Sequence, residues 1–270
     1  MKAPFSKKGN IEKTMIFGWN GETLHYSAEG EGTAVLLLHG LGGNAENWLL
    51  QRRHLAASHR VLSLDLPGNG RSSGRSVHFT DYWRAIEATL DHAGAPRAAL
   101  CGLSKGARAG LAFAARRPER VTAMVVVNAF LRLDADDRVR RLALYDLLLE
   151  ENGAERWADQ LLAMMGVEEY PAIVRGFRRS IGQIDPLHIR RIFREQDAFD
   201  QRPELQCVTC PALVVRGARD GFVPAYCADE IRAALIGSEL AVLDAGHLPY
   251  LEVPAEFNRC LSQFLARHSI

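Results

Sequence analysis

A serine flanked by glycines is the first residue in the sequence that could do covalent chemistry. Ser104 lies in the run Gly102-Leu103-Ser104-Lys105-Gly106, which follows an apolar segment and opens a helix-length one. Small residues around the serine let the backbone turn sharply from a strand into a helix, so that the hydroxyl projects from the edge of a sheet. A serine that only caps the helix is the alternative. We predict that Ser104 is a nucleophile.

A serine hydroxyl becomes a good nucleophile only when a base removes its proton, and His247 is the histidine best placed to do so. It lies in the loop after the last predicted strand, whereas Ser104 follows an earlier strand of the same predicted sheet. The carboxyl ends of parallel strands meet at one edge of a sheet. We therefore expect His247 to lie beside Ser104.

Two aspartates could orient the imidazole of His247. Asp220 follows the penultimate predicted strand, and Asp244 comes directly after the last one, three residues before the histidine. The side chain of Asp244 could turn toward either face of the sheet, whereas Asp220 completes the chain order Ser, Asp, His that is expected of a triad on this architecture. We predict that Asp220 holds the imidazole tautomer, His247 carries the proton and Ser104 forms an acyl-enzyme.

Two backbone amides are candidates for stabilising the oxyanion that forms in such a reaction. Leu41 lies in the glycine-rich run 39–43, and Lys105 begins the helix after Ser104, at its positive end. The Lys105 side chain has several interpretations, because the other four lysines all lie in the first thirteen residues. It contacts an anionic substrate group, or it lowers the pKa of His247, or it is solvated and contributes only its amide.

Apolar runs that alternate with helix-length segments predict an α/β fold with a mostly parallel sheet flanked by helices. The run Val35 to Leu38 is apolar at successive positions, as strands covered on both faces must be. The first two strands could pair antiparallel at an edge. The eight predicted strands are Thr14–Phe17, Thr23–Ala28, Ala34–His39, Arg60–Leu64, Ala98–Leu103, Val121–Val127, Ala212–Gly217 and Glu239–Leu243.

The strand pattern stops after Asn128, and the sequence then predicts several helices separated by glycine and proline. The breaks fall at Gly153, Gly166, Pro171 and Pro186. Strands resume near Pro211. We therefore predict that residues 1–128 and 201–270 form one core and that residues 129–200 are a helical lid inserted after the sixth strand.

These motifs together resemble the α/β-hydrolase superfamily. The serine turn, His39-Gly40, the turn Asp65 to Ser72 and the segments of Asp220 and His247 occur in that family's order. The resemblance covers nearly the whole chain and implies the α/β-hydrolase fold with a Ser-Asp-His triad. Within the family, the chain is most similar to small single-cap enzymes such as 3-oxoadipate enol-lactonases and related esterases. The lid stretch Asn128 to Asp134 also resembles the aminoacrylate hydrolase group of pyrimidine breakdown.

The leading functional prediction is a cofactor-free serine hydrolase that cleaves a carboxylic ester, lactone or thioester of a small to medium acid. The same triad could cleave carbon–carbon bonds in vinylogous diketones. A ligand sensor with a hydrolase-type pocket is the alternative from a different class. The turn departs from many relatives at Lys105 and at Ala107-Arg108. Candidates for contact with the substrate are Gly40, Trp48, Phe130, Trp157, Phe222 and Leu248.

The composition narrows the partners and the compartment. The chain has 270 residues and a formal net charge of +1, so it lacks the long-range field that would hold a nucleic acid or an acidic membrane. It shows neither a membrane-length apolar stretch nor a secretory signal, so we expect a cytoplasmic protein with a small-molecule substrate. The five cysteines are an odd, scattered set, which predicts free thiols and no metal site. A homo-oligomer is compatible with the sequence.

Overall fold

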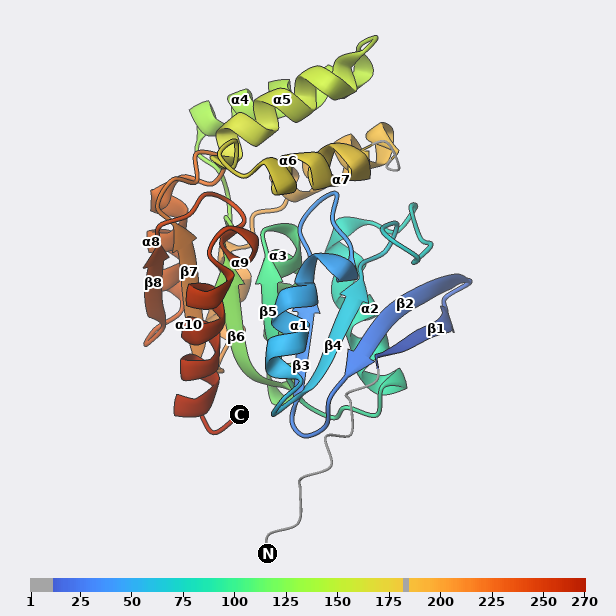
Figure 1. Cartoon of the computed structure of the whole chain (residues 1–270), viewed down its shortest axis with the longest axis vertical. Helices are drawn as coiled ribbons and strands as arrows, with labels where there is room; N and C mark the ends of the chain where they lie inside the picture. Colours follow the sequence, from blue (N-terminus) through green and yellow to red (C-terminus); the bar gives the residue numbers. More distant parts are fainter. Residues whose placement is uncertain (1–11, 182–184) are drawn as a thin grey trace, which may run out of the picture.

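An eight-stranded sheet forms the centre of the protein, with the strand order β1-β2-β4-β3-β5-β6-β7-β8 (Figure 1). The computed structural model describes residues 12–181 and 185–270. The strands are β1 (Lys13–Trp19), β2 (Glu22–Glu29), β3 (Ala34–Leu38), β4 (Arg60–Asp65), β5 (Ala98–Leu103), β6 (Val121–Val127), β7 (Ala212–Gly217) and β8 (Glu239–Leu243). All eight strands predicted from the sequence are present, with each end within two residues of its predicted position.

The strand directions also follow the prediction. β1 pairs antiparallel with β2 at one edge of the sheet, and β2 pairs antiparallel with β4. The remaining pairs, from β4 through β8, are all parallel. The carboxyl ends of these strands therefore meet at one edge of the sheet, and the loops that carry the candidate site residues start there.

Helices cover both faces of the sheet (Figure 1). They are α1 (Leu49–Leu55), α2 (Tyr82–His92), α3 (Lys105–Arg116), α8 (Ala225–Ala234), α9 (Pro249–Glu252) and α10 (Pro254–Arg267), with the short 3-10 helices η1 (Ala45–Trp48), η2 (Phe79–Asp81), η3 (Pro118–Arg120) and η5 (Arg202–Cys207). Val35 and Leu37 of β3 pack in the core on the side of α1 and α10. Leu36 and Leu38 pack on the side of α2, α3 and α8. Burial on both faces explains why this strand is apolar at every position.

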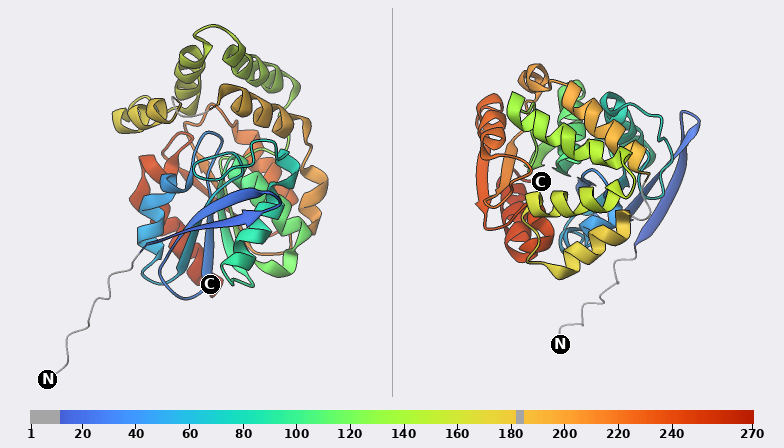
Figure 2. Two further views of the ribbon diagram at one scale, coloured as in Figure 1. Left: turned by 90° about the vertical axis from the view of Figure 1, so that its right-hand side faces the viewer. Right: turned by 90° about the horizontal axis from the view of Figure 1, so that it is seen from above.

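Further helices follow β6 along the chain and lie across the carboxyl edge of the sheet (Figures 1 and 2). They are α4 (Ala135–Asp146), η4 (Leu147–Leu149), α5 (Gly153–Met165), α6 (Pro171–Ile181) and α7 (Pro186–Ala198). The predicted breaks all fall at helix ends. Gly153 begins α5. Pro171 and Pro186 each begin a helix, where the missing amide proton of proline costs nothing. Gly166 ends α5 in the left-handed conformation that favours glycine, with φ +66°.

Arg108 on α3 connects both ends of this helical segment to the core. Its buried guanidinium donates to the carbonyl of Leu131 (3.2 Å) near the start of the segment. It also donates to the carbonyls of Gln196 (2.7 Å) and Phe199 (2.6 Å) near the end, and to Oε1 of Gln201 (3.2 Å). Burial lowers the pKa of Arg108 to about 9. An arginine suits this position because its five N–H donors can reach several carbonyls at once.

The cysteines are free thiols, as the sequence predicts. Cys101 is buried within β5, and burial raises the pKa of its thiol. Within residues 12–181 and 185–270, every helix is too short or too polar to traverse a lipid bilayer.

Candidate active site

Ser104 stands at a sharp turn between β5 and α3. Its backbone has φ +49° and ψ −112°, a conformation that is strained for any residue with a side chain. The turn requires its glycines. A Cβ on Gly106 would lie 2.3 Å from the carbonyl oxygen of Leu38, and a Cβ on Gly102 would lie 2.5 Å from the amide nitrogen of Ala107. The glycines thus allow α3 to pack closely on the sheet and present Ser104 at its carboxyl edge.

His247 and Asp220 are in direct contact. Nδ1 of His247 lies 2.7 Å from Oδ2 of Asp220, and both side chains are buried. The other carboxylate oxygen, Oδ1, accepts hydrogen bonds from the backbone amides of Phe222 (2.9 Å) and Val223 (3.0 Å). These bonds fix the carboxylate, which favours the tautomer in which Nδ1 of His247 donates to Asp220 and Nε2 is free to accept a proton.

Asp244, the competing aspartate, points away from the histidine. Its side chain is 85% exposed and forms an ion pair with Arg219. The structure therefore places Asp220 and not Asp244 against His247, in agreement with the preference argued from chain order.

Glu252 on α9 holds the loop of His247, and the sequence contained no motif that pointed to it. Its carboxylate accepts hydrogen bonds from the backbone amides of Gly246 (2.7 Å) and Leu248 (2.9 Å). Burial raises the pKa of the Glu252 carboxyl, although these two bonds and the nearby charge of Arg219 act in the opposite direction. Glu252 therefore acts on the backbone of the loop and leaves the imidazole free.

Asn128 is a second residue missing from the predicted site, and it joins the loops of the acid and the base. Its Nδ2 donates to the carbonyls of Gly246 (3.1 Å) and His247 (3.0 Å), and its Oδ1 accepts from the amide of Gly217 (2.9 Å) at the end of β7. Asn128 directly follows β6 at the carboxyl edge of the sheet. The positional argument that selected Asp220 would also have selected Asn128.

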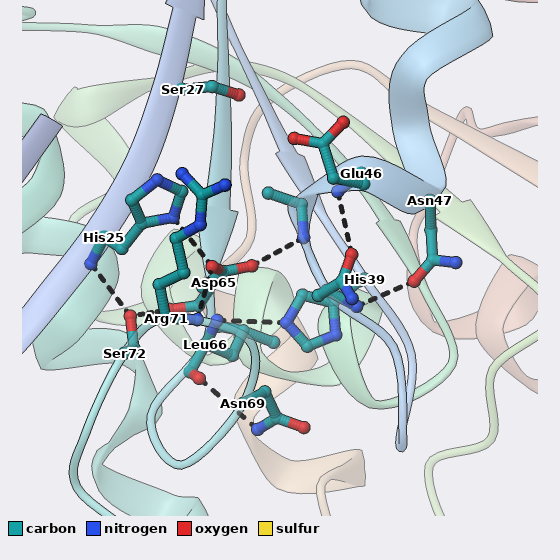
Figure 3. Close-up of polar contacts among 12 residues, drawn as sticks. His25, Ser27, His39, Glu46, Asn47, Asp65, Leu66, Asn69, Arg71 and Ser72 are labelled. Carbon is teal, nitrogen blue, oxygen red and sulfur yellow. Dashed lines mark hydrogen bonds and ion pairs between the residues drawn. The ribbon is translucent and has the colours of Figure 1, made fainter. Parts of the chain in front are cut away.

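The loop after β3 is held by two buried side chains, His39 and Asp65 (Figure 3). Nδ1 of His39 donates to the carbonyl of Gly40 (2.7 Å), and Nε2 accepts from the amide of Leu66 (3.0 Å). Asp65 accepts a hydrogen bond from the amide of Ala45 (2.6 Å). Burial lowers the pKa of His39 to about 3, so the ring stays neutral and keeps this pair of bonds. His39 has a structural role here.

The residues that carry the two predicted oxyanion amides both lie near Ser104. Leu41 belongs to the fixed loop after β3 and lines the same cavity as the serine. Lys105 is the first residue of α3, where a backbone amide has no partner within the helix. That these two amides donate to an oxyanion stays a prediction.

A cavity of about 560 Å³ opens in front of Ser104, and His247 also lines it. Most of its wall is apolar, and the segment between β6 and β7 supplies a large part of it. Tyr145 and Phe193 stack face to face there, with ring centroids 3.9 Å apart. Wall residues include Phe130, Tyr145, Leu161, Met165, Phe177, Phe193, Phe222 and Leu248. The site thus combines a serine, a histidine held by a carboxylate, and a cavity with a mostly apolar wall.

The alpha/beta hydrolase fold family matches residues 33–254 of the chain. The chain belongs to this family. The resemblance inferred from the motifs is therefore confirmed, together with the predicted fold class.

Two relatives of this α/β-hydrolase carry hydrolase names. The chain is 32% identical over 248 residues to a protein of Klebsiella pneumoniae (strain 342) named as carbamate hydrolase RutD, over 86% of this chain and 91% of that protein. It is 26% identical over 252 residues to 3-oxoadipate enol-lactonase 2 of Acinetobacter baylyi, over 90% and 93% of the two chains. The enol-lactonase of Burkholderia xenovorans LB400 has a similar structure, with a TM-score of 0.83 and 26% identity, over 93% of this chain and 100% of that one. The protein is an enzyme of the hydrolase class.

Two of the predicted substrate contacts in this hydrolase require correction. Four of the six predicted contact residues do line the cavity, namely Gly40, Phe130, Phe222 and Leu248. Trp48 is fully buried and stacks on Tyr250, with ring centroids 4.3 Å apart. Trp157 packs edge-on against Tyr145, with centroids 5.7 Å apart. Both tryptophans therefore lie behind residues of the wall and support them, because helical periodicity reveals an apolar face but not what that face meets.

The structure also contradicts two of the three interpretations of the Lys105 side chain. It is fully buried and lies outside the cavity wall, so it neither contacts a substrate in the cavity nor reaches solvent. Its Nζ is 5.5 Å from the ring centroid of Tyr82 and has no hydrogen-bond partner within the described ranges. Burial lowers the pKa of the amine to about 7, and the charge of Asp65 opposes this shift.

Proposed function

We propose that this hydrolase cleaves a carboxylic ester, lactone or thioester of a small to medium acid through Ser104, His247 and Asp220. The contact between His247 and Asp220 beside a cavity that Ser104 also lines is the observation that supports this most. A nucleophile, a base and a group that orients the base are what acyl transfer through a serine requires.

In this mechanism Asp220 keeps the proton on Nδ1 of His247. Nε2 takes the proton of Ser104 as its Oγ attacks the substrate carbonyl, and the carboxylate stabilises the imidazolium. The imidazolium then protonates the leaving oxygen or sulfur, so that the bond to the leaving group breaks and an acyl-enzyme remains. A water molecule activated in the same way releases the acid and restores Ser104.

The amides of Leu41 and Lys105 stabilise the oxyanion in this proposal. The hydrogen bonds of His39 and Asp65 to the loop after β3 support the Leu41 amide in a fixed position. Removing one preorganised donor typically lowers kcat by a factor of about 10²–10³, because such a donor needs no reorganisation when the charge develops.

The cavity favours an acyl group of medium size. Its volume of about 560 Å³ lies within the range of about 300–1,000 Å³ found for small-molecule sites. A small carbamate would fill little of this space, so an ester or lactone fits better than the carbamate for which one relative is named. The helices after β6 supply Tyr145 and Phe193 to the wall, which supports residues 129–200 as a lid over a core of residues 1–128 and 201–270.

The first test is the intact mass of the protein after reaction with a fluorophosphonate, which modifies activated serines without a matched substrate. We expect one stoichiometric adduct in the wild type and none in Ser104→Ala. Esters, lactones, thioesters, carbamates and vinylogous diketones are then screened by acyl length. An unlabelled wild type would overturn the proposal. Turnover of the diketones alone would favour carbon–carbon cleavage, and ligand-dependent lid movement without turnover would favour the sensor.

A further inference from the structure

Arg141 on α4 reaches from the helical segment after β6 to the loop that carries Asp220. Its guanidinium is buried, and Arg141 is not one of the described residues of the cavity wall. Nη2 of Arg141 donates to the carbonyl of Gly221 (2.6 Å), and Nε donates to the carbonyl of Phe222 (3.0 Å). Arg141 therefore holds the backbone of the two residues that directly follow Asp220.

The peptide units that Arg141 holds are the same ones that fix the carboxylate of Asp220. The amides of Phe222 and Val223 donate to Oδ1 of Asp220, at 2.9 and 3.0 Å. The carbonyl of Gly221 and the amide of Phe222 belong to one peptide unit, and the carbonyl of Phe222 and the amide of Val223 belong to the next. Because each peptide unit is planar and rigid, a bond at its carbonyl sets the direction of its N–H. Arg141 and Asp220 thus hold the two units from opposite ends.

The ring of Phe222 provides a second connection between Arg141 and the triad. The guanidinium of Arg141 lies 5.5 Å from the centroid of this ring. The same ring packs edge-on against the imidazole of His247, with centroids 5.3 Å apart, and it lines the cavity. A displacement of Arg141 would therefore disturb the packing of the histidine as well as the support of the aspartate.

The charge of Arg141 also favours the ionised form of Asp220. Burial lowers the pKa of the Arg141 guanidinium, and the charges of Asp137 and Asp220 oppose this shift. The opposing effect of Asp220 means that its carboxylate and the guanidinium attract each other. Arginine keeps its charge in proteins, so Arg141 stabilises the carboxylate that the imidazolium of the proposed reaction requires.

The start of α4 is itself fixed to the core, which gives Arg141 a firm base. Asp137, one turn before Arg141, accepts a hydrogen bond from the hydroxyl of Tyr226 on α8 (3.1 Å), and this hydroxyl accepts one from the amide of Asp134 (3.0 Å). Asp137 also pairs with Arg140 at 2.7 Å, whereas Nη2 of Arg141 is 3.7 Å away. Asp137 therefore keeps two partners when Arg141 is replaced.

The helical segment supports the loop of His247 in a similar way. The carbonyl of Met165, the last residue of α5, accepts a hydrogen bond from the amide of His247 (2.7 Å). A Cβ on Gly246 would lie 2.1 Å from the same carbonyl oxygen, so the end of α5 and the histidine loop pack backbone to backbone. Helices α4 and α5 thus hold the loops of both Asp220 and His247.

We propose that Arg141 is a positioning residue of the hydrolytic reaction, so that α4 and α5 form part of the catalytic machinery in addition to covering the cavity. The proposal rests on the proposed function, because Asp220 matters to the rate only if it orients His247 for the activation of Ser104. Arg141 acts through the two peptide units that follow Asp220. Its loss should therefore lower the rate of the chemical steps and leave the binding of substrate largely intact.

A double-mutant cycle between Arg141 and Asp220 tests the proposal. The readouts are the rate of labelling by the fluorophosphonate, and kcat and KM for 4-nitrophenyl hexanoate. Arg140→Gln is the matched control, because it removes the same charge from the next position of α4, where the side chain is 61% exposed. The variants compared with the wild type are Arg141→Gln, Arg141→Lys, Asp220→Asn and the double variant Arg141→Gln/Asp220→Asn.

Arg141→Gln should be labelled about tenfold more slowly than the wild type, since a displacement of about 1 Å can already cost about 10²-fold in rate. Its kcat should fall by a similar factor while KM changes little, because His247 and Asp220 act in both chemical steps. Arg141→Lys should recover part of the loss, because an ammonium keeps the charge without the fork of donors. Arg140→Gln should behave as the wild type. In the Asp220→Asn background, Arg141→Gln should have almost no further effect, because the carboxylate that it positions is gone.

The outcomes separate this proposal from the proposed function. An equal slowing by Arg141→Gln in both backgrounds, a loss confined to KM, or a rate equal to that of the wild type would overturn the positioning role and leave the serine hydrolase intact. If Arg141→Gln does not fold, Arg141→Lys replaces it in the cycle, and the same outcomes decide. Labelling needs no matched substrate, so it decides also where the hexanoate is hydrolysed poorly. A wild type that is neither labelled nor active would contradict the proposed function itself.

Discussion

Glu252 holds the backbone on both sides of His247. Its two carboxylate oxygens accept hydrogen bonds from the amides immediately before and after the histidine, at 2.7 and 2.9 Å. Asp220 contacts the ring of the same residue at Nδ1. The histidine is thus fixed twice, once through the backbone of its two neighbours by Glu252 and once through its ring by Asp220.

Replacing Glu252 should impair the activation of Ser104 although neither residue touches the other. In Glu252→Gln one acceptor oxygen becomes an amide donor that faces a backbone N–H, and a buried unmade hydrogen bond costs about 1–3 kcal/mol. We expect labelling by the fluorophosphonate to slow about tenfold in this variant and further in Glu252→Ala. Glu256→Gln, an exposed change on α10, is the control. Unchanged labelling rates in both Glu252 variants would show that the loop holds its shape without the carboxylate.

The two aspartates near the histidine should differ sharply in their effect. Asp220→Asn should lower kcat by about 10⁴, because the amide can donate to Nδ1 and stabilise the wrong tautomer. Asp244→Asn should change kcat little, since that carboxylate is 85% exposed and pairs with Arg219. Steady-state kinetics on the best ester from the screen measures both. A severe loss in the Asp244 variant with near-normal activity in the Asp220 variant would reverse the assignment.

The strands and the main site residues were predictable from two features of the sequence, the apolar runs of buried strands and the polar residues that directly follow them. Buried parallel strands leave runs such as Val121–Val127, whose observed bounds match the prediction. The carboxyl ends of such strands meet at one edge, so a serine, an aspartate and a histidine that each follow a strand are brought together without any knowledge of the loops.

Other parts of the site were less accessible from sequence. Glu252 and Asn128 act through backbone amides and carbonyls, which leave no spacing pattern in the residues they bind. Trp48 follows the glycine-rich run by five residues, and Trp157 lies at helical spacing in the segment after β6. Neither position says whether a large apolar side chain meets a cavity or a second layer of side chains. Arg179 lines the cavity, but its position in a segment rich in arginines gave no indication of this.

Arg108 should determine how firmly residues 129–200 stay attached to the core. Arg108→Leu leaves buried carbonyls at both ends of the segment without their donor, at about 1–3 kcal/mol for each unpaired group. We expect a lower Tm and faster proteolysis within the segment. Arg108→Lys should recover only part of the lost stability, because the donors of an ammonium cannot reach as many carbonyls as those of a guanidinium. In Arg132→Leu, where a half-exposed guanidinium loses its bond to Asp200, stability should barely change. Resistance to protease equal to that of the wild type would argue against this role of Arg108.

Lys105→Met should stabilise the fold at neutral pH, since the buried amine lacks a hydrogen-bond partner within the described ranges. Burial lowers its pKa from 10.5 to about 7. Between these values the unfolded chain binds a proton that the folded chain does not, so this group makes the wild type more stable as the pH rises. Methionine fills a similar volume without the charge. The gain in Tm should therefore be largest at and below pH 7 and should shrink toward pH 9.

Thermal unfolding of the wild type and Lys105→Met across that range measures the effect. The histidines whose pKa the Lys105 charge affects, His39 and His188, have pKa values lowered to about 3 and about 4, first of all by burial, so in the folded protein they stay neutral throughout. Burial raises the pKa of Tyr82 far above the range. The backbone amide of residue 105 is kept in the variant, so fluorophosphonate labelling of Ser104 should persist. A variant that is less stable at every pH would mean that the ammonium is satisfied in the folded state, by water for example, and that the amine contributes stability.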